Sequence, residues 1–407
     1  MPFLLLMPSY NQAHYIVEAV RSVLAQDDPD WELWILDNSS DGTPEAMRAF
    51  ADPRIRFHHI AARMDPGSCL NWLLERARGE LFSYVHTDNN LRADYVRRMR
   101  QALAGRPMGL AYCDSRTIRG DGSPKELFRR GPFDVARLFS LDTLGVPFSA
   151  TTALAHALGG FKVKDIADDV RFCVAALGRA DYVYVREALL DYRVHERSRT
   201  EASGGQSQVH RSFLDMFTQL LPELRARGID PLPALERAVA ERLDDLEWFV
   251  EDLWYRKLSR VLRPWWTAGP VAGHLFRAGL LALPGVAAPP PRALVRDAQG
   301  RIAAWPWQAW LARLYLGSRR RDLRRLIEKI QHVLLPWAYL SLGPATRSVA
   351  LAGGDFRSIV CAQLLQRGLA WTPVVAANVE RPGWLNWGVA TGAEPRLGGT
   401  TTVTPHP

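Results

Sequence analysis

Cysteine is scarce in this chain of 407 residues, and the four cysteines present lie far apart. Cys69, Cys113, Cys173 and Cys361 form no CxxC pair, and none has a histidine at the short spacing of a zinc site. The spacing excludes a disulfide framework of the kind found in small secreted domains, and it excludes the common structural zinc motifs. We therefore interpret these residues as buried thiols in a reducing compartment.

Long uninterrupted apolar runs are also absent. The stretch 261–283 is rich in tryptophan and leucine, but Arg263, His274 and Arg277 interrupt it, so it is not typical of a membrane-spanning helix. The apolar run Phe3–Met7 has no basic residue before it and no small-residue cleavage site after it, and we expect a first strand there rather than a signal peptide. A length of 407 residues predicts two or three domains.

Positive charge is concentrated in one segment. The range 255–347 holds 16 Lys and Arg against 3 Asp and Glu, a net charge of +13 within a chain whose total is +8. In its second half, basic residues precede an apolar stripe that begins at Leu326, and 11 of the 14 tryptophans lie at or after Trp248. Arginine beside interfacial tryptophan favours an anionic membrane surface. The alternative is that these helices pack on the N-terminal domain, with the arginines on a solvated face. Nucleic acid is disfavoured, since no recognised binding motif accompanies the charge.

The first half of the chain alternates apolar strand-like runs with helical periodicity, which is typical of an α/β fold with a mostly parallel sheet. The expected strands are 3–7, 31–36, 55–60, 81–85, 109–113 and 182–185, and the expected helices are 16–26, 44–50 and 68–77. From about residue 206 long helices follow, and the last 60 residues return to α/β with strands at 348–352 and 373–377 around a helix at 356–366. We divide the chain into a domain 1–205, a mainly helical region 206–283, a basic amphipathic helical region 284–347 and a small α/β segment 348–407 with a loose tail.

Polar residues follow three of the expected strands. They are Pro8-Ser9-Tyr10-Asn11, Asp37 to Thr43, and His86-Thr87-Asp88-Asn89. In an open α/β sheet, ligands bind beyond the carboxyl ends of the strands, so these segments are the first candidates for function. Asp, Asn and Gly after a strand are also common turn formers, and that alternative stays open for each segment alone.

The ordered set of motifs resembles family 2 glycosyltransferases over roughly residues 3–200. The motifs are MPSYNQAHYIVEAVRSVLAQ, WELWILDNSSDGT, FSYVHTDNN, GGFKVKDIADDVRF and YVYVREALLDYRVH. The resemblance implies a Rossmann-like GT-A fold, a nucleotide-diphosphate sugar donor, a divalent metal (Mn²⁺ or Mg²⁺) and inversion at the anomeric carbon. It implies a place in polysaccharide or glycoconjugate biosynthesis, with a glycan, a lipid-linked sugar or a protein as acceptor. We expect a cytoplasmic enzyme, peripheral at the inner face of the membrane.

The same resemblance implies roles at the donor site. Nucleotide-sugar-binding residues would be Pro8, Tyr10, Asp37, Asp41 and Arg193, and metal-binding residues would be Asp88, His86 and His195. A hard divalent cation that bridges two phosphates prefers oxygen ligands, which suits a carboxylate at Asp88. His86 occupies the first position of the family's DxD motif, where the alternative is a hydrogen-bonding residue that does not touch the metal.

The pair Asp168-Asp169 matches the family's Glu-Asp motif, in which the second acid is the general base. Asp169 would take the proton of the acceptor hydroxyl as that oxygen attacks, and Asp168 would orient the base or raise its pKa. The alternative is a helix N-terminus that favours two acids through the helix dipole. The family often has an arginine six residues beyond the base, where this chain has Ala175, and Arg171 or Arg179 could substitute for it.

Two other functions stay open. A catalytically inactive relative would bind a nucleotide sugar or a glycan as a scaffold, and the altered DxD motif favours it. A sugar-phosphate nucleotidyltransferase would share the sheet, but it would carry a GxGTRL-like loop where this chain has Pro8-Ser9-Tyr10-Asn11. Near the C-terminus, Gly353-Gly354 lacks the GxGxxG pattern, so a structural unit is favoured there over a second cofactor site.

Overall fold

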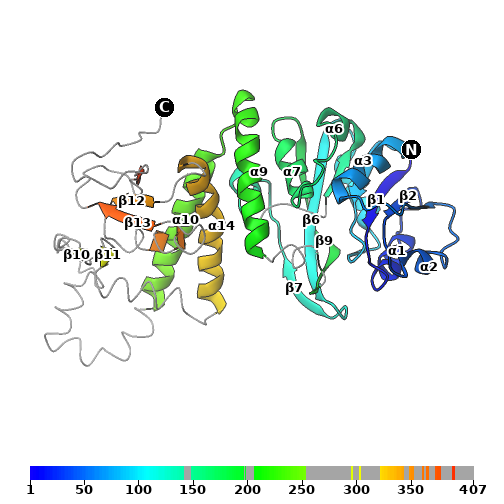
Figure 1. The fold of residues 1–407 in the computed structure, drawn as a ribbon, viewed down its shortest axis with the longest axis horizontal. Coiled ribbons are helices and arrows are strands. Elements are labelled where there is room, and N and C mark those ends of the chain that lie inside the picture. Colours follow the sequence, from blue (N-terminus) through cyan, green and yellow to red (C-terminus); the bar gives the residue numbers. More distant parts are fainter. Residues whose placement is uncertain are drawn as a thin grey trace. The chain divides into compact units, whose positions relative to one another are not determined.

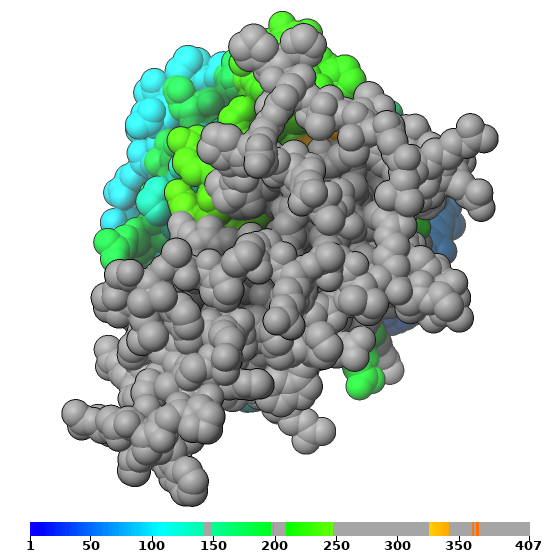
Figure 2. All heavy atoms as spheres, turned by 90° about the vertical axis from the view of Figure 1, so that its left-hand side faces the viewer, coloured from blue at the N-terminus to red at the C-terminus, as the bar shows by residue number. Residues whose placement is uncertain are grey.

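The computed structural model describes residues 1–141, 148–196, 198, 206–253, 295–296, 302–303, 321–342, 348–352, 360–361, 364–365, 372–376 and 387–389. The other residues are drawn in grey (Figure 1 and Figure 2). The chain forms two compact units, Met1–Pro231 and Leu232–Pro407. The first unit extends past residue 205 because helix α9 (Gln206–Ala226) packs against α7 (Asp168–Ala175). The finer division into four parts stays a prediction.

The first unit is built around one sheet of nine strands, in the order β3-β2-β1-β4-β8-β6-β9-β5 with β7 paired to β6 (Figure 1). The strands are β1 (Phe3–Ser9), β2 (Trp31–Asp37), β3 (Ile55–His59), β4 (Leu81–Tyr84), β5 (Asn90–Leu91), β6 (Gly109–Arg119), β7 (Pro124–Phe128), β8 (Phe148–Thr151) and β9 (Asp181–Val194). The remaining helices of this unit are α1 (Ile16–Leu24), α2 (Thr43–Met47), α3 (Pro66–Arg76), α4 (Tyr95–Leu103), α5 (Val135–Leu138) and α6 (Thr152–Ala157). The predicted α/β class is confirmed.

Only half of the sheet is parallel. Strands β1 to β4 run parallel, as the alternation of strands and helices predicts, but β8 pairs antiparallel with both β4 and β6. Strands β6 and β9 are much longer than the predicted runs 109–113 and 182–185, and they pair in parallel with register shifts near Asp114. Their extensions mix polar with apolar residues, so a search for apolar runs stops too early.

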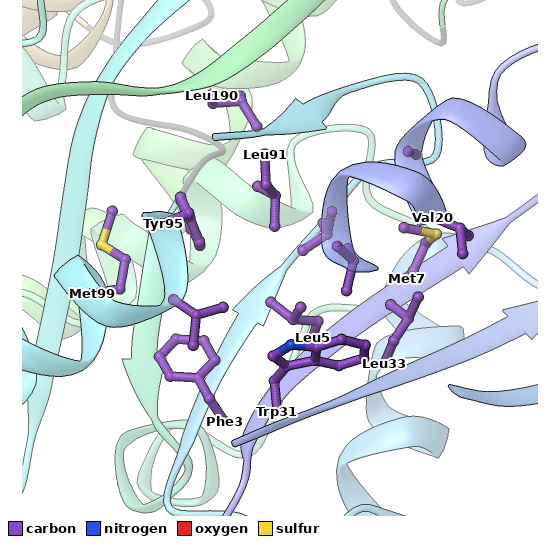
Figure 3. Close-up of a cluster of buried hydrophobic side chains, with 14 of the residues drawn as sticks. Phe3, Leu5, Met7, Val20, Trp31, Leu33, Leu91, Tyr95, Met99 and Leu190 are labelled. Carbon is purple, nitrogen blue, oxygen red and sulfur yellow. The ribbon is translucent and has the colours of Figure 1, made fainter. Parts of the chain in front are cut away.

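Strand β1 lies at the centre of the parallel half and is buried on both faces. Phe3, Leu5 and Met7 lie on one face, in a cluster with Trp31 and Leu33 of β2 (Figure 3). Helices α1 and α4 cover this cluster with the apolar residues that their periodicity places on one side, which are Ile16, Ala19, Val20, Val23, Tyr95, Val96, Met99 and Leu103. Burying side chains of this size stabilises the fold by about 1.5–3 kcal/mol each, and it fixes the strand ends relative to one another.

An aromatic cluster fixes the position of α7. The ring of Phe172 in α7 stacks on Phe161 with 4.7 Å between centroids, and on Phe148 of β8 with 5.2 Å. Phe82 of β4 meets all three rings edge to face. Because these rings come from two strands, a loop and a helix, their packing ties the start of α7 to the centre of the sheet.

The second unit contains two long helices, α10 (Leu232–Leu253) and α14 (Arg321–Leu342), which pack together. Leu235, Val239, Leu243 and Leu246 of α10 are buried, as their spacing predicts. Short strands follow: β10 (Val295–Arg296) pairs with β11 (Ile302–Ala303), and β12 (Ser348–Ala352) pairs with β13 (Thr372–Ala376) and β14 (Trp387–Val389). Among the residues described, no helix is both long and apolar enough to cross a membrane.

Several sequence predictions lie outside the described residues. They are the interrupted apolar stretch 261–283, the pair Gly353-Gly354, and most of the helix expected at 356–366.

Candidate active site

Three side chains form a row across the ends of β1, β2 and β3. Ser9 pairs in register with Asp37, and Asp37 pairs in register with His59. The Asp37 carboxylate is fully buried, and both of its oxygens accept hydrogen bonds. Oδ1 accepts from the Ser9 and Ser39 hydroxyls at 2.6 Å each, and Oδ2 lies 2.8 Å from His59 Nδ1 and 3.3 Å from the Ser39 amide nitrogen. The predicted nucleotide-binding acid is therefore enclosed by donors from its own chain.

The turn after β1 presents Tyr10 at this edge. Asn11 has a positive φ of 52°, a conformation that asparagine tolerates better than most residues, and its side-chain oxygen accepts from the Ser40 amide at 2.9 Å. Tyr10 is 40% exposed, and the Arg63 guanidinium lies 4.7 Å from the centre of its ring. Pro8, the other predicted lining residue here, is the penultimate residue of β1 and is partly buried. An exposed ring backed by a cation is suited to stacking on a nucleobase.

Asp41 ties two loops together. Its carboxylate accepts hydrogen bonds from the Thr43 hydroxyl and amide and from the Ala13 amide. Burial alone would raise the pKa of Asp41, but these hydrogen bonds outweigh it and hold that pKa below its usual range. The predicted tight turn before α2 is thus present, and the side chain of Asp41 holds it against the loop after β1.

The pair Asp88–His195 lies beyond the ends of β4 and β9. His195 Nε2 is 3.1 Å from Asp88 Oδ2, and the two side chains are 5% and 16% exposed. The His195 ring also packs on Tyr15, with 4.7 Å between centroids. The sequence therefore correctly identified two residues that meet in space although 107 positions separate them.

Arg193 holds this region together from the inside. Its side chain is 2% exposed, and its guanidinium donates to Glu18 Oε2 at 2.6 Å, to the Asp88 carbonyl at 3.0 Å and to the Gly120 carbonyl at 2.9 Å. The Arg193 amide also donates to Asn89 Oδ1 at 2.9 Å. These contacts fix the loop that carries Asp88, so Arg193 holds Asp88 in place from inside the fold.

His86 stands apart from the Asp88–His195 pair. Its ring packs edge to face on Tyr84, with 4.6 Å between centroids. Across the described ranges, no three His, Cys, Asp or Glu side chains cluster closely enough to hold a metal ion. For a metal that is shared with a diphosphate, two protein ligands suffice, because phosphate oxygens complete the coordination. Asp88 and His195, which face each other at 3.1 Å, fit that role.

A pocket of about 620 Å³ adjoins this pair. Its lining combines the start of α1, the turn between β6 and β7, and the end of β9, through His14, Tyr15, Gly120, Val194, His195 and Glu196. The pocket is large enough to admit a sugar or a phosphate group next to Asp88.

The approach to Asp168 and Asp169 depends on two glycines. Gly159 and Gly160 have φ of 77° and 83°, and a β-carbon on Gly160 would lie 2.4 Å from the side-chain oxygen of Asn71. Asn71 bonds both backbone groups of Phe161, at 2.7 and 2.9 Å. Only glycine permits this close approach, which directs the chain toward α7.

Asp168 and Asp169 are the first two residues of α7. Asp168 is buried and its Oδ1 accepts from the Asp169 amide at 3.1 Å, whereas Asp169 is partly exposed and accepts from the Val170 amide at 2.8 Å. The helix start therefore accommodates two acids, as the alternative interpretation expects. The more accessible acid is Asp169, the predicted base.

The two arginines proposed to replace the missing family arginine are engaged elsewhere. Arg171 pairs with Asp165 and donates to Gln219 of α9 at 2.8 Å. Arg179 donates to the Ala157 carbonyl at 2.9 Å. A third guanidinium that the sequence gave no reason to select, Arg130, is buried, and its charge acts on Tyr192 and Cys173.

Two buried side chains show that the predicted acids act on a common region. The pKa of Tyr192 is raised to about 12, chiefly by burial and also by the carboxylates of Asp88 and Asp169, while Arg130 opposes the rise. Burial likewise raises the pKa of Cys69 to about 12, with Asp37 and Asp168 among the charges that act on it. Long-range charge effects of this kind require proximity in a poorly solvated interior. The charges of Asp88 and Asp169 thus both act on Tyr192.

All four cysteines are buried and free, as predicted. Two residues of the site were missed: His59, whose ring nitrogen bonds Asp37, and Tyr192, whose pKa the charges of Asp88 and Asp169 raise. The polar end of the third strand was a signal for His59, because it follows the same pattern as the other strand ends.

Residues 5–163 match the family model described as glycosyl transferase family 2. TuaG of Bacillus subtilis, named for teichuronic acid biosynthesis, is 29% identical over 31% of this chain and 51% of its own length. ExoO of Rhizobium meliloti, a succinoglycan biosynthesis protein, is 30% identical over 32% of this chain and 37% of its own. WfgD of Escherichia coli, named as a UDP-Glc:α-D-GlcNAc-diphosphoundecaprenol β-1,3-glucosyltransferase, is 33% identical over 21% and 34%. The chain thus spans about half or less of the length of these relatives.

Among solved structures, S. aureus TarS 1–349 in complex with UDP-GlcNAc is similar to this chain with a TM-score of 0.47 and 18% identity, over 58% of this chain and 70% of that one. The mannosyltransferase PcManGT of Pyrobaculum calidifontis with GDP-Man and Mn²⁺ has a TM-score of 0.46 and 16% identity, over 83% and 86%.

The sequence match covers β1 through the approach to α7, which includes the strand ends at Asp37 and Asp88. Residues 5–163, which make up most of the N-terminal unit, therefore match glycosyl transferase family 2, and they lie on a mixed α/β sheet as the GT-A fold of that family requires.

Proposed function

We propose that this chain is an inverting glycosyltransferase that moves a sugar from a nucleotide-diphosphate donor to an acceptor hydroxyl. The proposal is carried by the match of residues 5–163 to glycosyl transferase family 2, together with two accessible acids, Asp88 beside His195 and Asp169 at the start of α7. One acid would hold the donor diphosphate and the other would activate the acceptor. Asp88 follows the carboxyl end of β4, where ligands bind in folds of this kind.

The nucleotide is assigned to the ends of β1 to β3, where Tyr10 presents an exposed ring. From there the diphosphate would extend to Asp88 and His195, the residues that would hold a divalent metal. Mn²⁺ or Mg²⁺ bound there would neutralise charge on the departing diphosphate. Arg193, buried beneath the loop, holds Asp88 in place for this contact.

Asp169 is assigned the proton transfer. Its carboxylate takes the proton of the acceptor hydroxyl while that oxygen attacks the anomeric carbon from the face opposite the nucleotide, so the configuration inverts. Asp168 is buried beside it and accepts from the Asp169 amide, which supports a positioning role. The acceptor is assigned to the class found in polysaccharide biosynthesis, a glycan or a lipid-linked sugar, because TuaG, ExoO and WfgD are named for such products.

A donor panel tests the proposal. The full chain is incubated with UDP-, GDP- and dTDP-sugars, Mn²⁺ or Mg²⁺ and a set of glycan and lipid-linked acceptors, and release of the nucleoside diphosphate is measured. We expect turnover with at least one donor and a product whose anomeric proton signals show inversion by NMR. A product with retained configuration would contradict the mechanism.

An inactive binding scaffold is the second candidate, and one observation favours it. Asp88 is the one acid in the segment that matches the DxD motif. His86 packs on Tyr84, and Asn89 accepts a hydrogen bond from the Arg193 backbone amide. A scaffold would bind a nucleotide sugar at equilibrium without releasing nucleoside diphosphate, and calorimetry beside the turnover assay distinguishes the two candidates.

Membrane contact at the cytoplasmic face stays a proposal that depends on charge. The apolar stripe of α14 does not support it, because Ile327, Ile330, Val333 and Leu334 are buried and α14 packs on α10. Arg325 is exposed at the start of this helix. Flotation with anionic liposomes at low and high salt tests the contact, and loss of binding at high salt is expected for an electrostatic attachment.

A further inference from the structure

We propose that His59 reads the nucleobase of the donor, with Asp37 acting behind it, so that the chain selects bases with a ring N–H group. This inference deepens the proposed function and rests on it. It begins from Asp37, whose two oxygens are both occupied by the chain itself. A carboxylate that is fully buried and already accepts from Ser9, Ser39 and His59 has no exposed edge left for a base.

The contact between Asp37 and His59 fixes the state of the imidazole. Asp37 Oδ2 lies 2.8 Å from His59 Nδ1, and the tautomer that makes this contact a hydrogen bond to a carboxylate carries its proton on Nδ1. In the neutral ring, the other nitrogen is then an acceptor. Among the described residues Nε2 of His59 has no hydrogen-bond partner, and the side chain is 37% exposed. His59 therefore offers one oriented acceptor to a ligand.

The position of His59 suits a nucleobase. It ends β3 in the same row as Ser9 and Asp37, one residue before the level at which Tyr10 leaves β1. Arg63, four residues further along the chain, reaches back to the Tyr10 ring at 4.7 Å. The segment after β3 thus runs beside the loop after β1. A base that stacks on Tyr10 would present its edge to this row.

An oriented acceptor distinguishes bases by their ring nitrogens. Uracil N3 and the N1 of guanine or hypoxanthine carry a proton and can donate to Nε2, whereas N3 of cytosine and N1 of adenine are acceptors. Two facing acceptors repel each other and lose hydrogen bonds to water. UDP and CDP form a matched pair, as do IDP and ADP. The two bases of each pair have the same ring system and differ in whether this ring nitrogen carries a proton.

Equilibrium binding by the full chain tests the proposal. UDP, CDP, GDP, IDP and ADP are titrated by calorimetry in the presence of Mn²⁺. We expect the N–H member of the preferred pair to bind at least about 5-fold more tightly than its partner, which corresponds to the loss of one hydrogen bond at about 1 kcal/mol.

The variant His59→Asn distinguishes contact with the base through Nε2 from the hydrogen bond to Asp37 through Nδ1. An asparagine amide can still donate to Asp37 from near the Nδ1 position, but it has no atom at Nε2. We expect the affinity ratio within the pair to fall toward 1 while the melting temperature stays within a few degrees. The control is His58→Asn, which alters the neighbouring residue on the opposite face of β3, between Trp34 and Trp72, and should leave the ratio unchanged.

The outcomes separate this inference from the proposed function. Preference for CDP or ADP, or an unchanged ratio in His59→Asn, would overturn the role of His59 and leave the glycosyltransferase proposal standing. An equal loss of affinity for all nucleotides in that variant would also overturn it, because it would place Nε2 on the ribose or the phosphates. Failure of the wild-type chain to bind any of the five nucleotides would overturn both.

Discussion

Two groups of carboxylates lie beyond the strand ends of the first unit, and they differ in how completely the chain satisfies them. Asp37 is fully buried, with donors on both oxygens. Asp88 is 16% exposed and meets one imidazole, and Asp169 is partly exposed at the start of α7. A carboxylate enclosed by donors builds structure, whereas one that faces solvent keeps the capacity to bind a cation or take a proton.

The largest effect is expected from Asp169→Asn, which removes the base and keeps the shape of the side chain. General-base catalysis contributes about 10²- to 10⁴-fold, so we expect turnover to fall by that factor with little change in donor affinity. Nucleoside diphosphate release measures turnover and calorimetry measures affinity.

Asp181→Asn is the matched control for Asp169→Asn, since Asp181 is an exposed aspartate at the start of β9. It should keep full turnover. Full turnover in Asp169→Asn would assign the base to another residue. It would also contradict the claim that the more accessible acids are the reactive ones.

Asp37→Ala tests whether the buried carboxylate stabilises the fold. It leaves the hydroxyls of Ser9 and Ser39 and the Nδ1 of His59 without their shared acceptor in a buried position, which costs about 2–4 kcal/mol. Urea unfolding, followed by circular dichroism, measures the loss.

The control for Asp37→Ala is Asp52→Asn, because Asp52 pairs with Arg54 at the surface near the other end of β3 and such pairs contribute about 0–1 kcal/mol. If the two variants lose equal stability, the buried hydrogen bonds around Asp37 contribute no more to the free energy of unfolding than a surface ion pair does.

His195→Gln tests whether the Asp88–His195 pair holds a metal. Loss of a ligand or of a residue that orients one lowers metal affinity about 10- to 100-fold, so the Mn²⁺ concentration that gives half-maximal activity should rise by that factor. The control is His14→Gln, in the same pocket and outside the pair. An unchanged Mn²⁺ requirement in His195→Gln would restrict His195 to its packing on Tyr15.

The parts of the site that the sequence predicts are those that follow local patterns. Apolar runs locate β1, β2 and β4, and the polar residues after them mark the edge where Asp37 and Asp88 lie. The third strand has the same signal, but His58 and His59 were counted inside the strand, and so the partner of Asp37 was missed. Alternating faces explain why only His59 of this pair reaches Asp37.

The remaining features depend on contacts between distant residues. Nothing near Arg193 in the sequence indicates that Glu18, Asp88 and Gly120 would satisfy its guanidinium. The length of β6 and β9 arises from their pairing with each other, because the polar residues after Cys113 would not predict a strand alone. Burial of a polar group depends on its partners, which a single sequence does not reveal.

The smallest effect is expected at Asp41, which lies beside the Asp37 row but is exposed. Its folded pKa is lowered, since hydrogen bonds from Thr43 and Ala13 to the carboxylate outweigh the opposing effect of burial. The stabilisation is therefore present above the unfolded pKa of about 4 and is lost as the pH falls through the lowered folded value. Asp41→Asn should cost about 0.5 kcal/mol or less at pH 7, after solvent screening, and less at pH 2 than at pH 7. Urea midpoints at the two pH values measure this, and an equal cost at both would show that the loop depends on the shape of the side chain and not on its charge.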